Sequence, residues 1–313
     1  WRAVAAEVFG HGNSSGTGLL VGMVPHPSAD PERVGRPTKP RDYHTTVNAR
    51  LSPSPLPLTT RRWVLRHGTG VTGLITLLGH LAIWVGLYAA GCVLAVGLLL
   101  GDSWPLRGML IAGLTAVGTY LIDRSGRLDP ADLAAHPDRA ALMIRFRPVV
   151  RGLALVMLGL ALLLAAGTSL AAVLVVMGAP IGVLLYGHRR HGVRPKDRLL
   201  IKNGVVAVSM AMMALILAGD GRPVGATMMA GIFILLHVFA DAMLCDLDDR
   251  QADADHGTRT IPAIWGEVTA WRLAVVIGLV AAGVLMIGAI LGLAHWSTVL
   301  LLGSVPLGAT ILI

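Results

Sequence analysis

From Val71 onward, long apolar runs alternate with short polar joints. A helix that crosses the hydrocarbon core of a bilayer needs about 20 mainly apolar residues. Eight such runs in succession predict membrane-spanning helices, because a soluble protein would not bury so many in a row. The predicted spans are residues 71–100, 105–122, 148–166, 169–186, 203–219, 223–244, 265–291 and 297–313. The expected fold class is therefore an all-α polytopic membrane protein, a bundle of eight transmembrane helices.

The segment before the first span has a different character. Residues 1–62 are rich in Pro, Gly, Ser, Thr and Arg and show no periodicity, which predicts disorder and no signal peptide. We therefore expect a transmembrane domain at residues 63–313. The chain begins with Trp1 and stops inside an apolar run, so we expect a truncated C-terminus and regard Met23 as a candidate start.

Composition supports the membrane prediction, and the charge distribution orients the bundle. The chain is 54% hydrophobic and 14% charged, and its two cysteines imply no disulfide framework. Of the 26 Lys and Arg residues, 24 fall in the N-terminal segment and in alternate joints, and the other side holds only Arg107 and Arg222. The positive-inside rule makes the first side cytoplasmic. The net charge of +8 is thus a topology signal, and nucleic acid is not an expected partner.

The strongest chemical signal is an aspartate cluster at the cytoplasmic end of the sixth span. Asp246, Asp249 and Asp253 advance by three and then four residues, which places them on one helix face. Carboxylates gathered at a membrane edge repel one another unless a hard cation such as Mg²⁺ compensates them, and Mg²⁺ usually brings a phosphorylated substrate. Within the same span, His237 and Asp241 are intramembrane ionisable residues and hence supporting candidates.

The first acidic segment along the chain, residues 119–139, lies at the cytoplasmic end of the second span. Asp123 lies nearest the membrane, while Gly126 and Pro130 break helical continuity and place Asp129 and Asp132 on an irregular turn. Alone this segment is also compatible with a solvated loop. This segment lies on the same side of the membrane as the aspartate cluster of the sixth span. Asp123, Asp129 and Asp132 are therefore candidate metal ligands as well.

Basic residues occur on that side as well. If the phosphorylated substrate loses a diphosphate, the metal neutralises part of the charge on that leaving group, and Lys or Arg must neutralise the rest. The candidates for diphosphate binding are Arg124, Arg190, Lys196 and Lys202. Positive-inside anchoring is the competing interpretation of this segment.

These motifs resemble those of the UbiA-type intramembrane prenyltransferase superfamily. Its second Asp-rich motif reads D-x-x-D-x-x-x-D-x-x-x-G-x-x-T-[LI]-P. The positions that match it are Asp246, Asp249, Asp253, Gly257, Thr260, Ile261 and Pro262. The family's Tyr-x-x-x-Lys element resembles Tyr186-x-x-x-Arg190, with Arg in place of Lys, and its basic residue at the start of the fifth span resembles Lys202. The resemblance thus implies catalytic roles for Tyr186, Arg190 and Lys202.

The first Asp-rich motif departs from the family pattern N-x-x-x-D-x-x-x-D. Asp123 stands where Asn is expected, and Arg127 stands where the first Asp should be. Asp129 or Asp132 is the candidate replacement, through a shifted loop.

The resemblance also implies the rest of the activity. Nine helices would be present in the full chain, with the ninth after Ile313. Mg²⁺ would bind a polyprenyl diphosphate at the cytoplasmic face of a bacterial-type inner membrane. The prenyl group would pass to a small lipophilic acceptor, expected to be aromatic or a quinone precursor.

Other functions compete with this one. A terpene cyclase on the same fold, or a degenerate homologue without activity, would share these motifs. The CDP-alcohol phosphotransferases also use Mg²⁺ and phosphates, but they need Gly where Arg250 follows Asp249. Transporters usually place charges near the membrane midplane, whereas these lie at one face.

Overall fold

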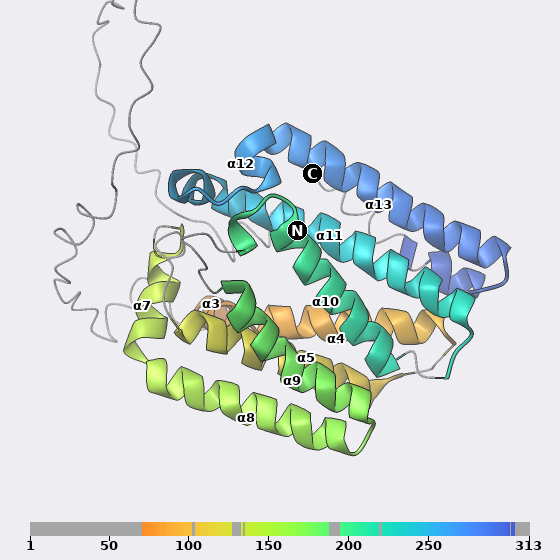
Figure 1. Ribbon diagram of the computed structural model, residues 1–313, viewed down its shortest axis with the longest axis horizontal. Coiled ribbons are helices and arrows are strands. Elements are labelled where there is room, and N and C mark those ends of the chain that lie inside the picture. Colours follow the sequence, from red (N-terminus) through yellow and green to blue (C-terminus); the bar gives the residue numbers. More distant parts are fainter. Residues whose placement is uncertain are drawn as a thin grey trace, which may run out of the picture.

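The computed structural model describes residues 71–101, 104–126, 133, 135–187, 195–218, 221–300 and 302–303, and in this part of the chain it contains helices and no strand. The helices form an elongated bundle (Figure 1). Their bounds are α3 Val71–His80, α4 Ile83–Leu99, α5 Leu106–Ser125, α7 Pro137–Arg145, α8 Arg147–Ala166, α9 Leu170–Gly187, η1 Pro195–Asp197, α10 Ile201–Ala218, α11 Val224–His256, α12 Ile261–Trp265 and α13 Glu267–Ile290. In one part of the bundle α5 packs between α4 and α8, and in the other α11 packs between α10 and α13.

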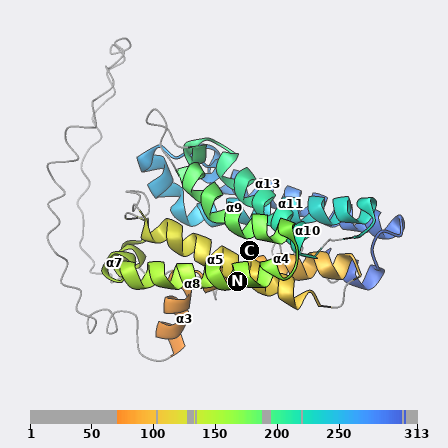
Figure 2. The same cartoon turned by 60° about the horizontal axis from the view of Figure 1, so that its bottom comes forward.

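The apolar runs agree with these helices in position. In the described residues six helices are long and apolar enough to span a membrane, namely α5, α8, α9, α10, α11 and α13. The first predicted span is divided, because α3 and α4 meet at an angle of 68°. Ala82 adopts a left-handed conformation with φ of 60°, which interrupts the helix. If this bent pair is one span the count is seven, and Figure 2 shows α3 turned away from the bundle. The predicted eighth span, residues 297–313, lies largely outside the described residues.

The outer surface of the bundle is apolar. Leu155, Leu163 and Leu174, on α8 and α9, are each more than 60% exposed. Water would penalise this surface by about 25 cal/mol for each Å² of apolar area, whereas lipid does not. The chain is therefore an integral, multi-pass membrane protein.

Small residues allow the helices to approach closely inside the bundle. A Cβ added to Gly108 on α5 would lie 2.5 Å from the carbonyl oxygen of Leu217 on α10. A Cβ on Gly86 of α4 would lie 3.0 Å from the carbonyl oxygen of Gly113 on α5. These contacts are backbone against backbone, which is how helices in lipid gain packing energy.

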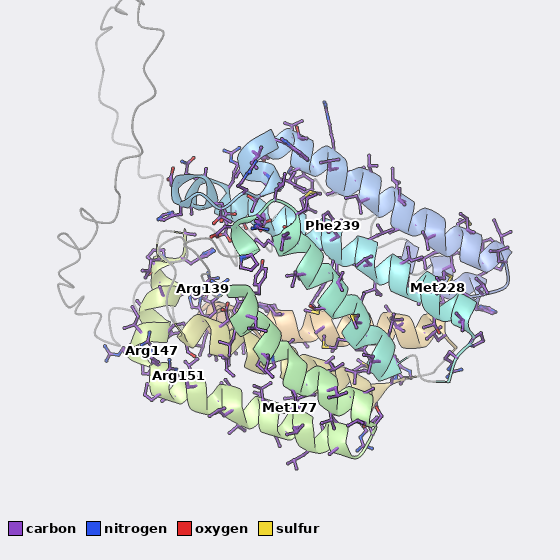
Figure 3. All side chains as sticks on the ribbon, viewed as in Figure 1. Arg139, Arg147, Arg151, Met177, Met228 and Phe239 are labelled. Carbon is purple, nitrogen blue, oxygen red and sulfur yellow. The ribbon has the colours of Figure 1, made fainter. Side chains whose placement is uncertain are left out.

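The polar end of the bundle carries a group of arginines. Figure 3 shows Arg139, Arg147 and Arg151 at the end where α7 joins α8, with Met228 near the opposite end of α11. Arg147 Nη2 donates to the carbonyl oxygen of Gly126 at 2.9 Å, and Arg151 Nη2 donates to that of Ser125 at 3.1 Å. Cations there satisfy the last carbonyls of α5 and its helix dipole.

Candidate functional site

The site lies on the last turns of α11, which run beyond its apolar stretch. The helix continues to His256, so Asp246, Asp249 and Asp253 are all helical, as their spacing predicts. Gly257 then ends the helix in the left-handed conformation, with φ of 77°. Asp246 and Asp253 are both buried, with 4% and 5% of their surface exposed. Two carboxylates are thus buried at the edge of a membrane bundle, where each requires a compensating charge.

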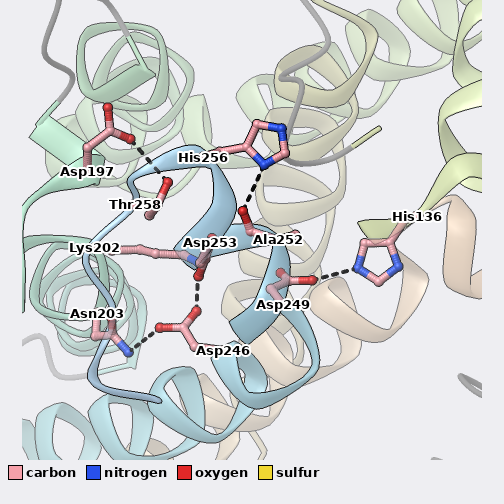
Figure 4. Close-up of polar contacts among 10 residues, drawn as sticks. All are labelled: His136, Asp197, Lys202, Asn203, Asp246, Asp249, Ala252, Asp253, His256 and Thr258. Atoms are coloured by element: carbon pink, nitrogen blue, oxygen red, sulfur yellow. Dashed lines mark hydrogen bonds and ion pairs between the residues drawn. The ribbon is translucent and has the colours of Figure 1, made fainter. Parts of the chain in front are cut away.

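Lys202 at the start of α10 supplies that charge (Figure 4). Its Nζ lies 2.7 Å from Asp246 Oδ1 and 3.6 Å from Asp253 Oδ2. The neighbouring Asn203, which is buried, donates through Nδ2 to Asp246 Oδ2 at 3.1 Å. The pair Lys202 and Asn203 therefore holds Asp246 through both of its oxygens. In this arrangement the ammonium group of Lys202 contacts two of the three predicted metal ligands.

Asp249 faces a different partner. Its Oδ1 lies 2.9 Å from Nε2 of His136, the residue that precedes α7. Burial alone would raise the pKa of the Asp249 carboxyl, but the hydrogen bond and charge of His136 outweigh it and hold that pKa below its usual range. Because His136 belongs to the first acidic segment, this contact joins the two acidic segments across 113 residues.

Asp253 has the least satisfied carboxylate of the three. Its Oδ2 is buried and makes no hydrogen bond among the described residues. Burial raises the pKa of this carboxyl to about 6; Lys202 opposes the shift, and the charges of Asp246 and Asp249 add to it. A buried carboxylate oxygen that lacks a donor is a suitable ligand for a hard cation.

The donor set fits Mg²⁺ in its chemistry, since all three side chains offer carboxylate oxygens on adjoining turns of one helix. Within the described residues, however, no three Asp, Glu, His or Cys side chains already converge on one point. Asp246 and Asp253 converge on the ammonium group of Lys202, and Asp249 turns to His136. Metal binding would require Lys202 to move aside and Asp249 to change its rotamer.

The motif residues after the aspartates build a turn that closes the site. The amide of Thr258 donates to the carbonyl oxygen of Asp253 at 2.9 Å, and the amide of Arg259 donates to that of Asp197 in η1 at 3.1 Å. Thr260 is buried and precedes α12, whose first turn contains Pro262, a position where proline suits a helix. Gly257, Thr260 and Pro262 thus fix the path of the chain rather than offer ligands.

The other predicted site residues lie near this end of the bundle or outside the residues that the structure describes. Asp123 is exposed in the last turn of α5. The guanidinium of Arg124 lies over the ring of Tyr120, 4.9 Å from its centroid, where it packs as a cation–π pair. Tyr186 lies in the last turn of α9. The residues outside the described part are Asp129, Asp132 and Arg190, together with the side chain of Lys196.

Two residues that contact the aspartates were not among the predicted site residues. Asn203 follows Lys202 at the mouth of a span, and a polar amide in that position is itself a signal. The only sequence signal for His136 was its position within the first acidic segment, because its partner Asp249 lies in a distant helix. Its role follows from tertiary packing alone.

His237 and Asp241 form a separate polar group, one to two turns earlier on α11. His237 Nε2 lies 3.4 Å from Asp241 Oδ2, so the two residues pair with each other. Tyr88 of α4 also donates to Asp241, at 2.8 Å. This group lies deeper along α11 than the three aspartates.

Comparison with known proteins places this geometry in a family. The UbiA homolog from Archaeoglobus fulgidus bound to GPP and Mg²⁺ has a similar structure, with a TM-score of 0.54 and 15% identity over 76% of this chain and 85% of that one. A structure from the same organism bound to DMAPP and Mg²⁺ gives a TM-score of 0.50 and 15% identity, over 75% and 83%. None of the curated proteins matches the sequence. The model of the UbiA prenyltransferase family matches residues 147–313, more than half of the sequence, and the chain belongs to that family.

Proposed function

We propose that this protein transfers a prenyl group from a polyprenyl diphosphate to a small lipophilic acceptor, with Mg²⁺ as cofactor. The observation that carries the proposal is the aspartate face of α11. Asp246 and Asp253 are buried, and among the described residues no group donates a hydrogen bond to Asp253 Oδ2, from which Lys202 Nζ is 3.6 Å away. Buried carboxylates of this kind are costly for folding, which favours a functional reason for keeping them.

Each side chain has a distinct task in this mechanism. Asp246, Asp249 and Asp253 would hold Mg²⁺, which neutralises charge on the leaving diphosphate. Lys202, released from Asp246, would donate to a diphosphate oxygen, because its ammonium group is already at the site. Tyr186, Arg190 and Lys196 remain proposed contributors from the α9–α10 segment. The C1–O bond of the prenyl diphosphate breaks, and the apolar bundle keeps water from the allylic cation.

The first acidic segment would complete the site from the opposite side. His136 already reaches Asp249 from this segment. We propose Asp123, Asp129 and Asp132 as additional ligands and Arg124 as a further diphosphate contact. Since Arg127 replaces an aspartate of the family pattern, this half of the site would bind metal less tightly than the α11 half.

The proposed location follows from the charge distribution. The joints that carry most Lys and Arg are those beside the aspartates, so the site and the N-terminal segment would face the cytoplasm of a bacterial-type membrane. The catalytic domain would comprise residues 63–313, and residues 1–62 would lie outside it.

Pyrophosphate release tests the proposal. The purified full chain, given Mg²⁺ and geranyl diphosphate with a panel of acceptors, should release pyrophosphate, and Asp249→Ala and Asp253→Ala should each abolish it. Asp255→Asn is the matched control, because Asp255 is exposed on the same helix and, among the described residues, accepts a hydrogen bond from Gln251 alone. Unchanged release in both alanine variants would reject the metal assignment. Release that needs no acceptor, with a cyclic product, would favour a terpene cyclase.

A further inference from the structure

A second polar group lies within the bundle, where α4 meets α11. Tyr88 Oη donates to Asp241 Oδ2 at 2.8 Å, and His237 Nε2 approaches the same oxygen at 3.4 Å. Three ionisable side chains thus meet inside a membrane-spanning region, where each is expensive to retain. Nothing in the aspartate site uses them, so they need a reason of their own.

The surroundings of this group are aromatic. Phe233 stacks on the imidazole of His237 with parallel rings and a centroid separation of 5.8 Å. The ring of Tyr88 lies 6.4 Å from the same imidazole, tilted by 32°. The chain has only four Phe and four Tyr, and one of each lies here. Phe233 is itself buried, whereas Tyr88 and His237 are only partly buried, so these two rings are the ones that a planar ligand could contact beside the carboxylate.

Asp241 remains accessible in spite of its two partners. Its side chain keeps 34% of its surface exposed, against 16% for His237. Both contacts use Oδ2, and among the described residues Oδ1 makes no hydrogen bond. A carboxylate has about four acceptor positions, so Oδ1 is available to a donor from a ligand. A pair that served only to tie α4 to α11 would not need an accessible oxygen.

The position along α11 suits an acceptor. Asp241 precedes Asp246 by five residues, which is about 7.5 Å along a helix axis at 1.5 Å per residue. The same five residues turn Asp241 by about 140° around the helix relative to Asp246, so the two side chains leave α11 on different faces. An acceptor held at Asp241 would therefore lie beside α4, further from the mouth of the bundle than the three aspartates.

We propose that Asp241, oriented by Tyr88 and His237, binds a hydroxylated aromatic acceptor through Oδ1 and receives the proton that this acceptor loses. The identification of the ligand as an acceptor rests on the proposed prenyl transfer. As the C1–O bond breaks, its electron pair leaves with the diphosphate. The O–H bond of the acceptor gives its proton to Asp241 and its electron pair to the ring, and the ring supplies the pair for the new bond to C1. Where that bond is to carbon, the hydrogen on that carbon shifts to the oxygen by tautomerisation.

Naphthol fluorescence provides the test, because excited 2-naphthol passes its proton to a nearby base and then emits as naphtholate. The full chain in detergent would be titrated with 2-naphthol, without Mg²⁺ or prenyl diphosphate. The naphthol would be excited at a wavelength longer than those that tryptophan absorbs. We expect saturable binding with naphtholate emission. Asp241→Asn should weaken binding about tenfold, as expected for the loss of one charge-assisted hydrogen bond, and should remove the increase in naphtholate emission that accompanies binding. Asp241→Glu should retain the emission, and Asp255→Asn should behave as the wild type.

A matched ligand makes the test independent of any variant's folding. 2-Methoxynaphthalene has the same rings but no hydroxyl proton, and the wild type should bind it about tenfold more weakly than 2-naphthol. Equal affinities for the two ligands, or unaltered emission in Asp241→Asn, would overturn the proposal. Because the titration needs no diphosphate, its result is separate from pyrophosphate release. Asp249→Ala should lose release while it keeps 2-naphthol binding.

Discussion

The contact of Lys202 with two aspartates makes a specific prediction about metal-free protein. We consider Lys202→Met, which keeps most of the apolar stem and removes the ammonium group. In the structure this group lies 2.7 Å from Asp246 Oδ1 and 3.6 Å from Asp253 Oδ2. Without it, two carboxylates remain buried at the mouth of the bundle, and the hydrogen bond from Asn203 reaches Asp246 but not Asp253. The variant should therefore be destabilised until another cation enters.

The magnitude follows from burial. The side chain of Lys202 is 28% exposed and that of Asp246 only 5%, so solvent screens this pair weakly. Breaking a buried pair by removing one partner costs about 3–5 kcal/mol. At about 2–4 °C for each kcal/mol, the lower figure corresponds to a fall in the unfolding temperature of roughly 6–12 °C. Lys202→Arg keeps the charge and should lose much less.

Mg²⁺ distinguishes this explanation from a general packing defect. Since Lys202 competes with metal for the same oxygens, Lys202→Met should bind Mg²⁺ at least about tenfold more tightly than the wild type, in line with the loss of one nearby positive charge. Thermal unfolding of the full chain in detergent, with EDTA and with increasing Mg²⁺, measures both effects. Mg²⁺ should restore most of the lost stability in the variant. If Mg²⁺ stabilises both proteins equally, or the variant unfolds at the wild-type temperature in EDTA, the competition is refuted.

Two further predictions concern packing and pH. Gly108→Ala should destabilise the bundle by about 1–3 kcal/mol, because its Cβ would lie 2.5 Å from the carbonyl oxygen of Leu217. A Cβ at Gly91 would meet nothing within 4 Å, so Gly91→Ala should be neutral or stabilising in the same unfolding assay. The pKa of about 6 at Asp253 means that protons compete with Mg²⁺ below pH 6. The Mg²⁺ concentration for half-maximal pyrophosphate release should then rise up to about tenfold per pH unit, and a constant value from pH 7 to pH 5 would contradict this role of Asp253.

Local patterns account for what the sequence predicted well. The apolar runs mark the helices because lipid requires each span to satisfy its own backbone hydrogen bonds. The spacing of Asp246, Asp249 and Asp253 predicts one helix face because a helix has a fixed period. The break between α3 and α4 was not predicted, since it depends on the left-handed conformation of Ala82, a residue with high helix propensity.

The sequence did not indicate which side chains contact one another across the bundle. His136 and Asp249 are 113 residues apart, and Tyr88 and Asp241 are 153 apart. Neither pair has a periodicity or a motif that links its members. Lys202 was predicted to bind diphosphate, but no local pattern indicated that its ammonium group would lie between two carboxylates. Such contacts depend on how helices pack, which is set by many small residues together.

The position of these groups on α11 connects the two proposals. Asp241 and the three aspartates belong to one continuous helix that no proline interrupts between Val224 and His256. A helix of this kind fixes the separation of its side chains far better than loops do. If the aspartates hold the diphosphate through Mg²⁺, then C1 of the prenyl group and the proton acceptor are kept at a set distance by the same element. Acceptors whose hydroxyl and reactive carbon do not match that distance would be rejected by geometry, even where their affinity for the bundle is high.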